Sequence, residues 1–273
     1  MPEPLLYESH CHTPLCKHAY GEPDEYAAVA LERGLKGITF TCHCPLPGGF
    51  SAPVRMAPEQ FDGYVAMIGE TRDRFAGKLD VRLGLECDFY PGIEDWHRAL
   101  LARAPFSHVL GSIHYQIPEY RALFHPGDTR LYQEVYFDHL ARSAESGLFD
   151  TLAHPDLIKN ESPREWDFES MRPVIARALD RIAATGVAME LNTSGVEKRI
   201  PEMNPSPSML SMMRERDIPV VIGADAHYAR RVGDGYVTAL RMLETAGYDE
   251  VSWFIDRKRR SATIKEALAS LQM

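Results

Sequence analysis

The sequence predicts an α/β protein in which parallel strands alternate with helices, either closed into a barrel or left as an open sheet. Short apolar runs rich in β-branched residues recur along the chain, and stretches with helical apolar spacing separate them. Glycine follows several of the helical stretches as a stop signal, as in "RGLKG", "ESGLFD" and "ATGVAME". Strand and helix alternate seven times, which is typical of repeated β/α units.

The expected elements follow one another in regular order. Strand-like runs occupy residues 5–12, 36–43, 81–89, 108–115, 150–156, 187–194 and 219–227. Helical spacing predicts helices over Pro23–Arg33, Pro58–Phe75, Ile93–Arg103, Thr129–Ser146, Arg164–Ala184, Pro207–Arg216 and Ala229–Ala246. A late strand at 251–256 and a tail helix at 262–271 complete the chain. Because α/β barrels routinely reach this length, we expect a single domain over residues 1–273.

The composition excludes several function classes. The chain carries a net charge of −9, which argues against sequence-independent binding to duplex nucleic acid but not against an anionic small molecule held through bound cations. No apolar run is long enough to span a bilayer, and the start "MPEPLLYESH" lacks the pattern of a signal peptide. We therefore expect a cytoplasmic protein whose five cysteines are free thiols or metal ligands.

Each strand-like run begins apolar and ends in residues that can bind a metal or carry acid chemistry. In chain order these are His10 and His12, His43, Glu86 and Asp88, His114, His154 and Asp156, Glu190 and Asn192, and Asp225 and His227. In a β/α barrel the carboxyl ends of the strands converge on one face. Seven distant segments would thus deliver imidazole and carboxylate groups to one place, which predicts a metal site.

Strand periodicity separates ligands from bystanders, because alternate side chains point to opposite faces. His10 and His12 share a face, whereas Cys11, Cys42, Cys44 and Cys87 fall on the opposite parity from the neighbouring histidines or Glu86. The "CHC" at 42–44 therefore resembles a zinc motif without having its geometry. Parity says nothing about Cys16, which lies in a loop.

Among the other histidines, we expect His97 and His139 on the surface of helices and His108 in the core or at its rim. His125 lies in a loop, and the sequence does not decide whether that loop is functional or an ordinary part of the surface.

Taken together, these segments resemble the polymerase-and-histidinol-phosphatase (PHP) superfamily of metal-dependent phosphoesterases, and within it the histidinol-phosphate phosphatases. The resemblance rests on "HCH", "TCHC", "GLECDF", "GSIHY", "LAHPDLIK" and "GADAH", in the right order over nearly the whole chain. "PLCKHA", "VRM" at 54–56 and "NTSG" at 192–195 resemble the histidinol-phosphatase branch. The resemblance implies a distorted TIM-like (β/α)7 barrel with the metal site at the carboxyl ends of the strands.

The resemblance also implies two to three divalent metal ions, with Zn, Fe or Mn as candidates. One metal would be held by His10, His12, Glu86 and Asp225, a second by His18, His43 and His227, and a third by His114 and His154, with Glu86 bridging. The implied reaction is hydrolysis of L-histidinol phosphate to L-histidinol and phosphate by a metal-bridging hydroxide, with Glu86, Asp225 and His227 as catalytic residues. The sequence does not choose the proton donor for the leaving group.

Basic residues near these motifs are candidates for binding the phosphate: Arg55, Lys159, Lys198 and Arg199. Two departures from the family pattern bear on this reading. Cys42 stands where the family usually has an Asp that supports a neighbouring ligand, and Glu197 stands where an Arg is expected.

Three alternatives remain open at this point. The chain could be a related phosphoesterase acting on nucleotide or oligonucleotide phosphates, a non-catalytic metal-binding module, or a thiol-redox protein. We expect a small-molecule phosphate ester as substrate, no membrane and no stable nucleic-acid complex. The sequence leaves the oligomeric state open, a homo-oligomer included.

Overall fold

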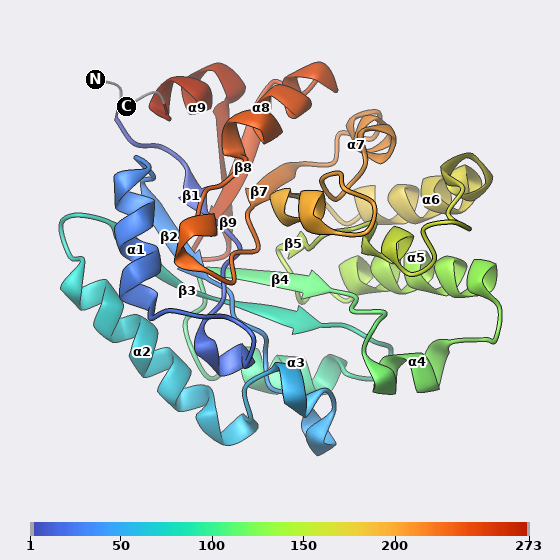
Figure 1. Cartoon of the computed structure of the whole chain (residues 1–273), viewed down its shortest axis with the longest axis horizontal. Coiled ribbons are helices and arrows are strands. Elements are labelled where there is room, and N and C mark those ends of the chain that lie inside the picture. The colour runs from blue at the N-terminus through green and yellow to red at the C-terminus, as the bar shows by residue number, and fades with distance from the viewer. Residues whose placement is uncertain (1–2, 272–273) are drawn as a thin grey trace.

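A computed structural model describes residues 3–271 and places their strands in one sheet whose order follows the chain. Figure 1 shows the helices arranged around the outside of these strands. The strands are β1 (Tyr7–Glu8), β2 (Gly37–Phe40), β3 (Asp80–Asp88), β4 (His108–Ser112), β5 (Thr151–Leu152), β6 (Ala188–Asn192), β7 (Val220–Gly223), β8 (Glu250–Ile255) and β9 (Lys258–Thr263). Neighbours from β1 to β8 run parallel, and β8 pairs with β9 antiparallel.

Helices connect most of the parallel strands and cover them from outside. They are α1 (Pro23–Glu32), α2 (Phe61–Arg74), α3 (Glu94–Leu101), α4 (Pro118–Phe124), α5 (Thr129–Glu145), α6 (Phe168–Ala183), α7 (Pro207–Arg214), α8 (Tyr236–Thr245) and α9 (Ile264–Ser270). Helix α2 shows why such segments fold onto the sheet: Phe61, Tyr64 and Ile68 recur at helical spacing and are fully buried. Each such side chain contributes roughly 1.5–3 kcal/mol by leaving water.

A backbone bridge beyond the carboxyl ends of β1 and β7 joins the two sides of the row of parallel strands, although β1 and β7 themselves are not paired. Just beyond β1 and β7, Cys11 and Ala226 form a parallel bridge. The Ala226 amide donates to the His10 carbonyl and the His12 amide donates to the Ala226 carbonyl, each at 3.0 Å. The expected distorted barrel is therefore confirmed, with the segments that carry the predicted ligands on either side of the closure.

Several local expectations were wrong. Strand β9 and helix α4 were not predicted, and α8 begins at Tyr236, after a separate 3₁₀ turn over Ala229–Arg231. His97 and His139 were expected on the surface but are buried: the Tyr120 hydroxyl lies 2.7 Å from His139 Nδ1, and His97 packs toward the strands. Within residues 3–271, every helix is too short or too polar to cross a membrane.

Candidate metal centre

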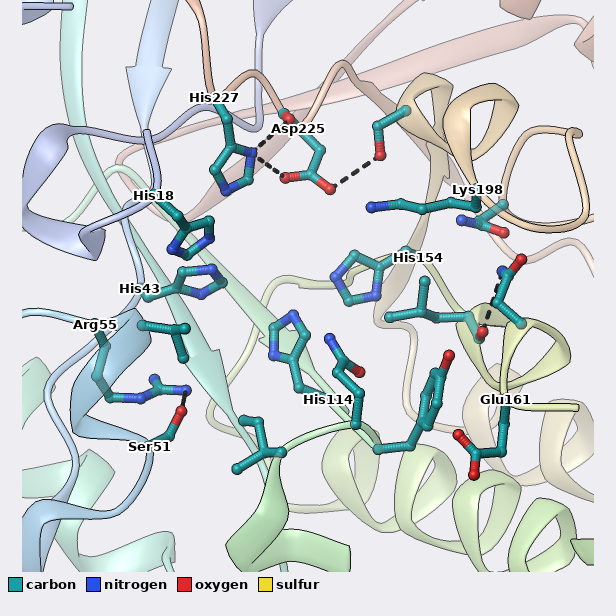
Figure 2. A pocket seen from close by; sticks show the side chains of 18 of the residues that line it. His18, His43, Ser51, Arg55, His114, His154, Glu161, Lys198, Asp225 and His227 are labelled. Carbon is teal, nitrogen blue, oxygen red and sulfur yellow. Dashed lines mark hydrogen bonds and ion pairs between the residues drawn. The ribbon is translucent and has the colours of Figure 1, made fainter. Parts of the chain in front are cut away.

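The nine predicted metal ligands lie together at the carboxyl ends of the strands. Six of them line a cavity of about 910 Å³, and His10, His12 and Glu86 are fully buried beside these six. Figure 2 shows six of them around this cavity: His18, His43, His114, His154, Asp225 and His227. Two of these six hold unusual backbone conformations, since His154 has φ 30° and Asp225 has φ 49°. Positive φ is costly for residues other than glycine and concentrates at functional sites.

Glu86 lies at the centre of the cluster, at the end of β3, and its two oxygens face different groups of histidines. Oε2 lies 2.8 Å from His43 Nδ1 and 3.5 Å from His10 Nε2. Oε1 lies 3.1 Å from His154 Nε2 and 3.5 Å from His114 Nε2. A carboxylate placed in this way can bridge two cations, one on each oxygen.

Asp225 organises the opposite side of the cluster together with three histidines. Its Oδ1 lies 3.1 Å from His12 Nε2, and its backbone carbonyl accepts a hydrogen bond from His227 Nδ1 at 3.0 Å. His18 Nδ1 donates to the Cys16 carbonyl at 2.7 Å. Because a carbonyl can only accept, both Nδ1 atoms carry the proton, and Nε2 of His18 and of His227 is left with a free lone pair.

Several buried polar atoms of the cluster have no hydrogen-bond partner among residues 3–271. They include His10 Nε2 and His227 Nε2, and also His43 Nδ1 and Glu86 Oε2, whose 2.8 Å contact does not have the geometry of a hydrogen bond. Buried polar atoms are almost always paired, so a group of orphans facing one another needs a common partner. The donor set of imidazole nitrogens and carboxylate oxygens suits divalent Zn, Fe or Mn, and the residues present therefore fit the metals that the sequence motifs imply.

Two acidic residues outside the predicted ligand set orient the ligands. Glu190 on β6 accepts from His10 Nδ1 at 2.7 Å through Oε1 and from the His154 amide at 2.8 Å through Oε2. Asp88 at the end of β3 accepts from His114 Nδ1 at 2.6 Å. Such carboxylates fix the ring orientation and raise the basicity of the coordinating nitrogen. The sequence marked both residues only as acidic strand ends, without this role.

Charges within the cluster compete with burial in setting its protonation. Burial alone would raise the pKa of Glu86, but the nearby His43, His10 and His114 outweigh it and hold that pKa well below its usual value. Burial likewise opposes protonation of His12, yet the hydrogen bond to Asp225 and further contacts raise its pKa to about 9. Without metal, the site therefore combines ionised Glu86 with a protonated His12, whereas burial lowers the pKa of His43 to about 4 and leaves its ring neutral.

The four cysteines that strand parity placed behind the ligands lie outside the cavity lining, as does Cys16, and all five are buried. The Thr13 hydroxyl donates to Cys42 Sγ at 3.2 Å. Burial opposes ionisation of Cys42, but contacts with Cys16 and His12 lower its pKa well below the usual value. The thiol of Cys42 thus lies near His12, at the position where the family usually has an aspartate, but His12 Nδ1 accepts or donates no hydrogen bond within residues 3–271.

Two of the four candidate phosphate-binding residues form ion pairs with buried acidic side chains. Lys159 is fully buried outside the cavity lining, with Nζ 3.0 Å from Asp156 and 3.1 Å from Glu202, so its assignment to phosphate is corrected. Arg55 borders the cavity, but its Nη1 lies 2.7 Å from Asp88 Oδ2 and donates to the Cys44 carbonyl at 3.0 Å. Its charge is largely neutralised by this pair.

The other two candidates stay available to a ligand. The side chain of Lys198 points into the cavity in Figure 2 and forms no ion pair or hydrogen bond with any of residues 3–271. Arg199 also lines the cavity and only reaches the carbonyls of Asn160 and Glu161, at 3.5 and 3.4 Å. Glu197 lies on the same rim with 63% of its side chain exposed, 3.5 Å from Arg231.

Comparisons with known proteins agree with this architecture. The PHP domain family model matches residues 8–194. The chain is 40% identical over 249 residues to a probable histidinol-phosphatase of Deinococcus radiodurans, covering 89% of this chain and 94% of that protein. It is 28% identical over 258 residues to the histidinol-phosphatase of Bacillus subtilis, covering 84% and 96%.

The fold is also that of a solved structure from Lactococcus lactis, a histidinol phosphate phosphatase complexed with zinc, L-histidinol and phosphate. That structure superposes with a TM-score of 0.77 at 18% identity, covering 93% of this chain and 99% of the other. The family model covers more than half of the chain and the most similar of these relatives nearly all of it. The chain therefore belongs to the PHP domain family.

Proposed function

We propose that this protein is a metal-dependent phosphomonoesterase that hydrolyses L-histidinol phosphate to L-histidinol and inorganic phosphate. The observation that supports the proposal most strongly is the convergence of nine imidazole and carboxylate side chains in one cluster, six of which line the same cavity. The names of the two sequence relatives support the choice of substrate.

The ligand set divides into two to three metal positions in this proposal. One position uses His10, His12, Glu86 and Asp225; a second uses His18, His43 and His227; a third uses His114 and His154 with Glu86 shared. Divalent cations bound there lower the pKa of water and neutralise charge on the phosphoryl oxygens.

Two residues at the cavity act on the substrate. The free ammonium of Lys198 contacts the phosphate, because it points into the cavity with no protein partner among residues 3–271. Asp225 accepts the proton of the attacking water and passes it to the leaving oxygen. His227 is less suited to this task, because its Nδ1 proton is committed to the Asp225 carbonyl and its only lone pair, on Nε2, is assigned to a metal, whereas Asp225 has a second carboxylate oxygen besides the one that faces His12.

A cytoplasmic location is part of the same proposal. All five cysteines are free, although Cys16 and Cys42 lie close together in the same buried cluster. Thiols kept reduced in this way fit a reducing compartment.

The test is phosphate release by metal-replete protein from L-histidinol phosphate, compared with an aryl monoester and an aryl diester. We expect a strong preference for L-histidinol phosphate that chelation abolishes. Activity confined to the aryl esters would leave the metal chemistry in place but refute L-histidinol phosphate as the substrate. Glu197→Arg would then be the first substitution to make. Hydrolysis that survives chelation would refute the metal mechanism.

A further inference from the structure

A second cluster of potential ligands lies behind the metal centre, on the other face of the same two chain segments. His43 and Glu86 form a parallel bridge and send their side chains to the catalytic cluster. The next residue on each segment, Cys44 and Cys87, points the opposite way. There both meet His97 of α3, and the two sulfurs and a ring nitrogen all lie within 4.8 Å of one another.

His97 presents an unsatisfied lone pair in this cluster. Its Nε2 donates to the Asp88 carbonyl at 2.8 Å, so Nε2 carries the proton and Nδ1 does not. The residue is fully buried, and Nδ1 has no hydrogen-bond partner among residues 3–271. A buried imidazole nitrogen in this state needs a donor or a cation, and the Cys44 and Cys87 thiols lie close to the His97 ring.

We propose that Cys44, Cys87 and His97 form a metal site separate from the catalytic centre, and that it takes a thiophilic divalent cation of the zinc class. Zinc binds sulfur at about 2.3 Å and imidazole nitrogen at about 2.1 Å, so ligand atoms around one ion lie at most roughly 4.6 Å apart. The spacing of the three atoms is therefore close to what one ion requires, with only small side-chain adjustments.

Charge balance favours a divalent ion at this position. Binding forms two metal–sulfur bonds and one metal–nitrogen bond, and the two thiol protons are released to solvent. The dication and two thiolates sum to zero, which suits a site where both cysteines and the histidine are fully buried. An ion held there would connect the segments that follow β2 and end β3 to α3, directly behind the proposed catalytic-metal ligands His43 and Glu86.

Cobalt tests this site, because thiolate coordination to Co²⁺ gives a near-ultraviolet charge-transfer band that imidazole and carboxylate ligands do not give. Cys16 and Cys42 also lie beside the catalytic ligands and could contribute such a band. The test protein is therefore the full chain with Cys11→Ser, Cys16→Ser and Cys42→Ser, which retains only Cys44 and Cys87 as thiols.

We expect metal-stripped protein of this composition to bind Co²⁺ with the charge-transfer band present, and further Cys87→Ser or Cys44→Ser substitution to abolish it. One fewer cobalt per chain should accompany the loss, while the catalytic cobalt stays bound. A folded triple variant that binds cobalt without the band would overturn the proposal.

A milder variant guards against misfolding of the cysteine variants. Replacing His97 with Asn in the otherwise native chain keeps both thiols and a polar side chain but shortens the reach to the ion. We expect the cobalt ion that gives the charge-transfer band to bind at least tenfold more weakly in this variant. The circular dichroism spectrum should stay unchanged. Equal affinity in this variant would exclude His97 as a ligand and contradict the proposed site.

Discussion

Glu190→Gln tests whether the orientation of the ligand His10 affects metal affinity while every proposed ligand stays in place. The side chain is buried and does not belong to the proposed metal-binding set. One of its oxygens accepts from His10 Nδ1 at 2.7 Å, and the other accepts from the His154 amide at 2.8 Å and from Asn192 at 3.0 Å. A glutamine keeps the shape but offers an acceptor on one side only.

The cost of Glu190→Gln follows from those contacts. Whichever way the amide turns, one side loses a hydrogen bond to a carboxylate, and its NH₂ group faces another donor. A hydrogen bond to a charged group contributes roughly 1.5–3 kcal/mol. Since about 1.4 kcal/mol corresponds to a factor of ten, we expect metal affinity to fall by about 10–100-fold.

The assay is competition for the metal against a chromophoric chelator, with thermal unfolding followed in parallel. Glu145→Gln is a matched control, because Glu145 pairs with Arg181 on the surface, where an ion pair is worth at most about 1 kcal/mol. The control should bind metal like the native chain. If a folded Glu190→Gln protein also bound metal with native affinity, the orienting role of Glu190 would be refuted.

Three further predictions concern packing, substrate binding and pH. In Gly223→Ala, the new Cβ would lie 2.2 Å from Glu190 Oε1 and 2.7 Å from His10 Cβ, so chemical denaturation should show a loss of about 1–3 kcal/mol in unfolding free energy. Lys198→Ala should lower kcat/KM for a phosphate monoester about tenfold, by roughly 1.5 kcal/mol of lost charged contact, with Tm unchanged. The control Lys78→Ala, at an exposed position in the turn before β3, should change neither kcat/KM nor Tm. Metal affinity should rise between pH 6.5 and about 9, because the raised pKa of His12 keeps its ring protonated there in the metal-free protein and the proton must leave before a metal binds. A flat affinity profile over that range, measured by the same chelator competition, would contradict the assignment of His12 as a ligand.

The metal ligands at the ends of the strands were the part of the site that the sequence predicted best. His10, His12, His43 and Glu86 could be assigned to one face because strand periodicity and the convergence of parallel strands are local and geometric rules. Each ligand follows a recognisable apolar run, so its position did not depend on knowing the tertiary partners.

Side-chain contacts between segments far apart in the sequence could not be predicted in the same way. Arg55 and Lys159 look like phosphate ligands in the sequence, but each finds a buried acidic partner, Asp88 and Asp156 respectively. Which basic side chains remain free therefore depends on contacts between separate segments. The orienting role of Glu190 was hidden for the same reason, since His10 lies 180 residues away in the chain.

The missed elements have simple physical causes. Strand β9, with the sequence "KRRSAT", is almost entirely exposed and lacks the apolar alternation that marks a strand. Helix α4 spans only seven residues, too few to establish a periodic pattern. His97 was assigned to the surface because a histidine in a polar helix is usually exposed, whereas here it lies on the buried side of α3.

The bridge between Cys11 and Ala226 has a consequence for the order of events during synthesis. It places His10 and His12 beside Asp225 and His227, although more than 200 residues separate them. A ribosome-bound chain can pair β1 with β2 early, but it cannot assemble the complete ligand set until His227 has left the exit tunnel. Contacts so distant in sequence also slow folding, because a long loop must close before they form. Metal loading at the catalytic centre is therefore a late event, and shorter nascent chains expose unpaired histidines to whatever ions surround them.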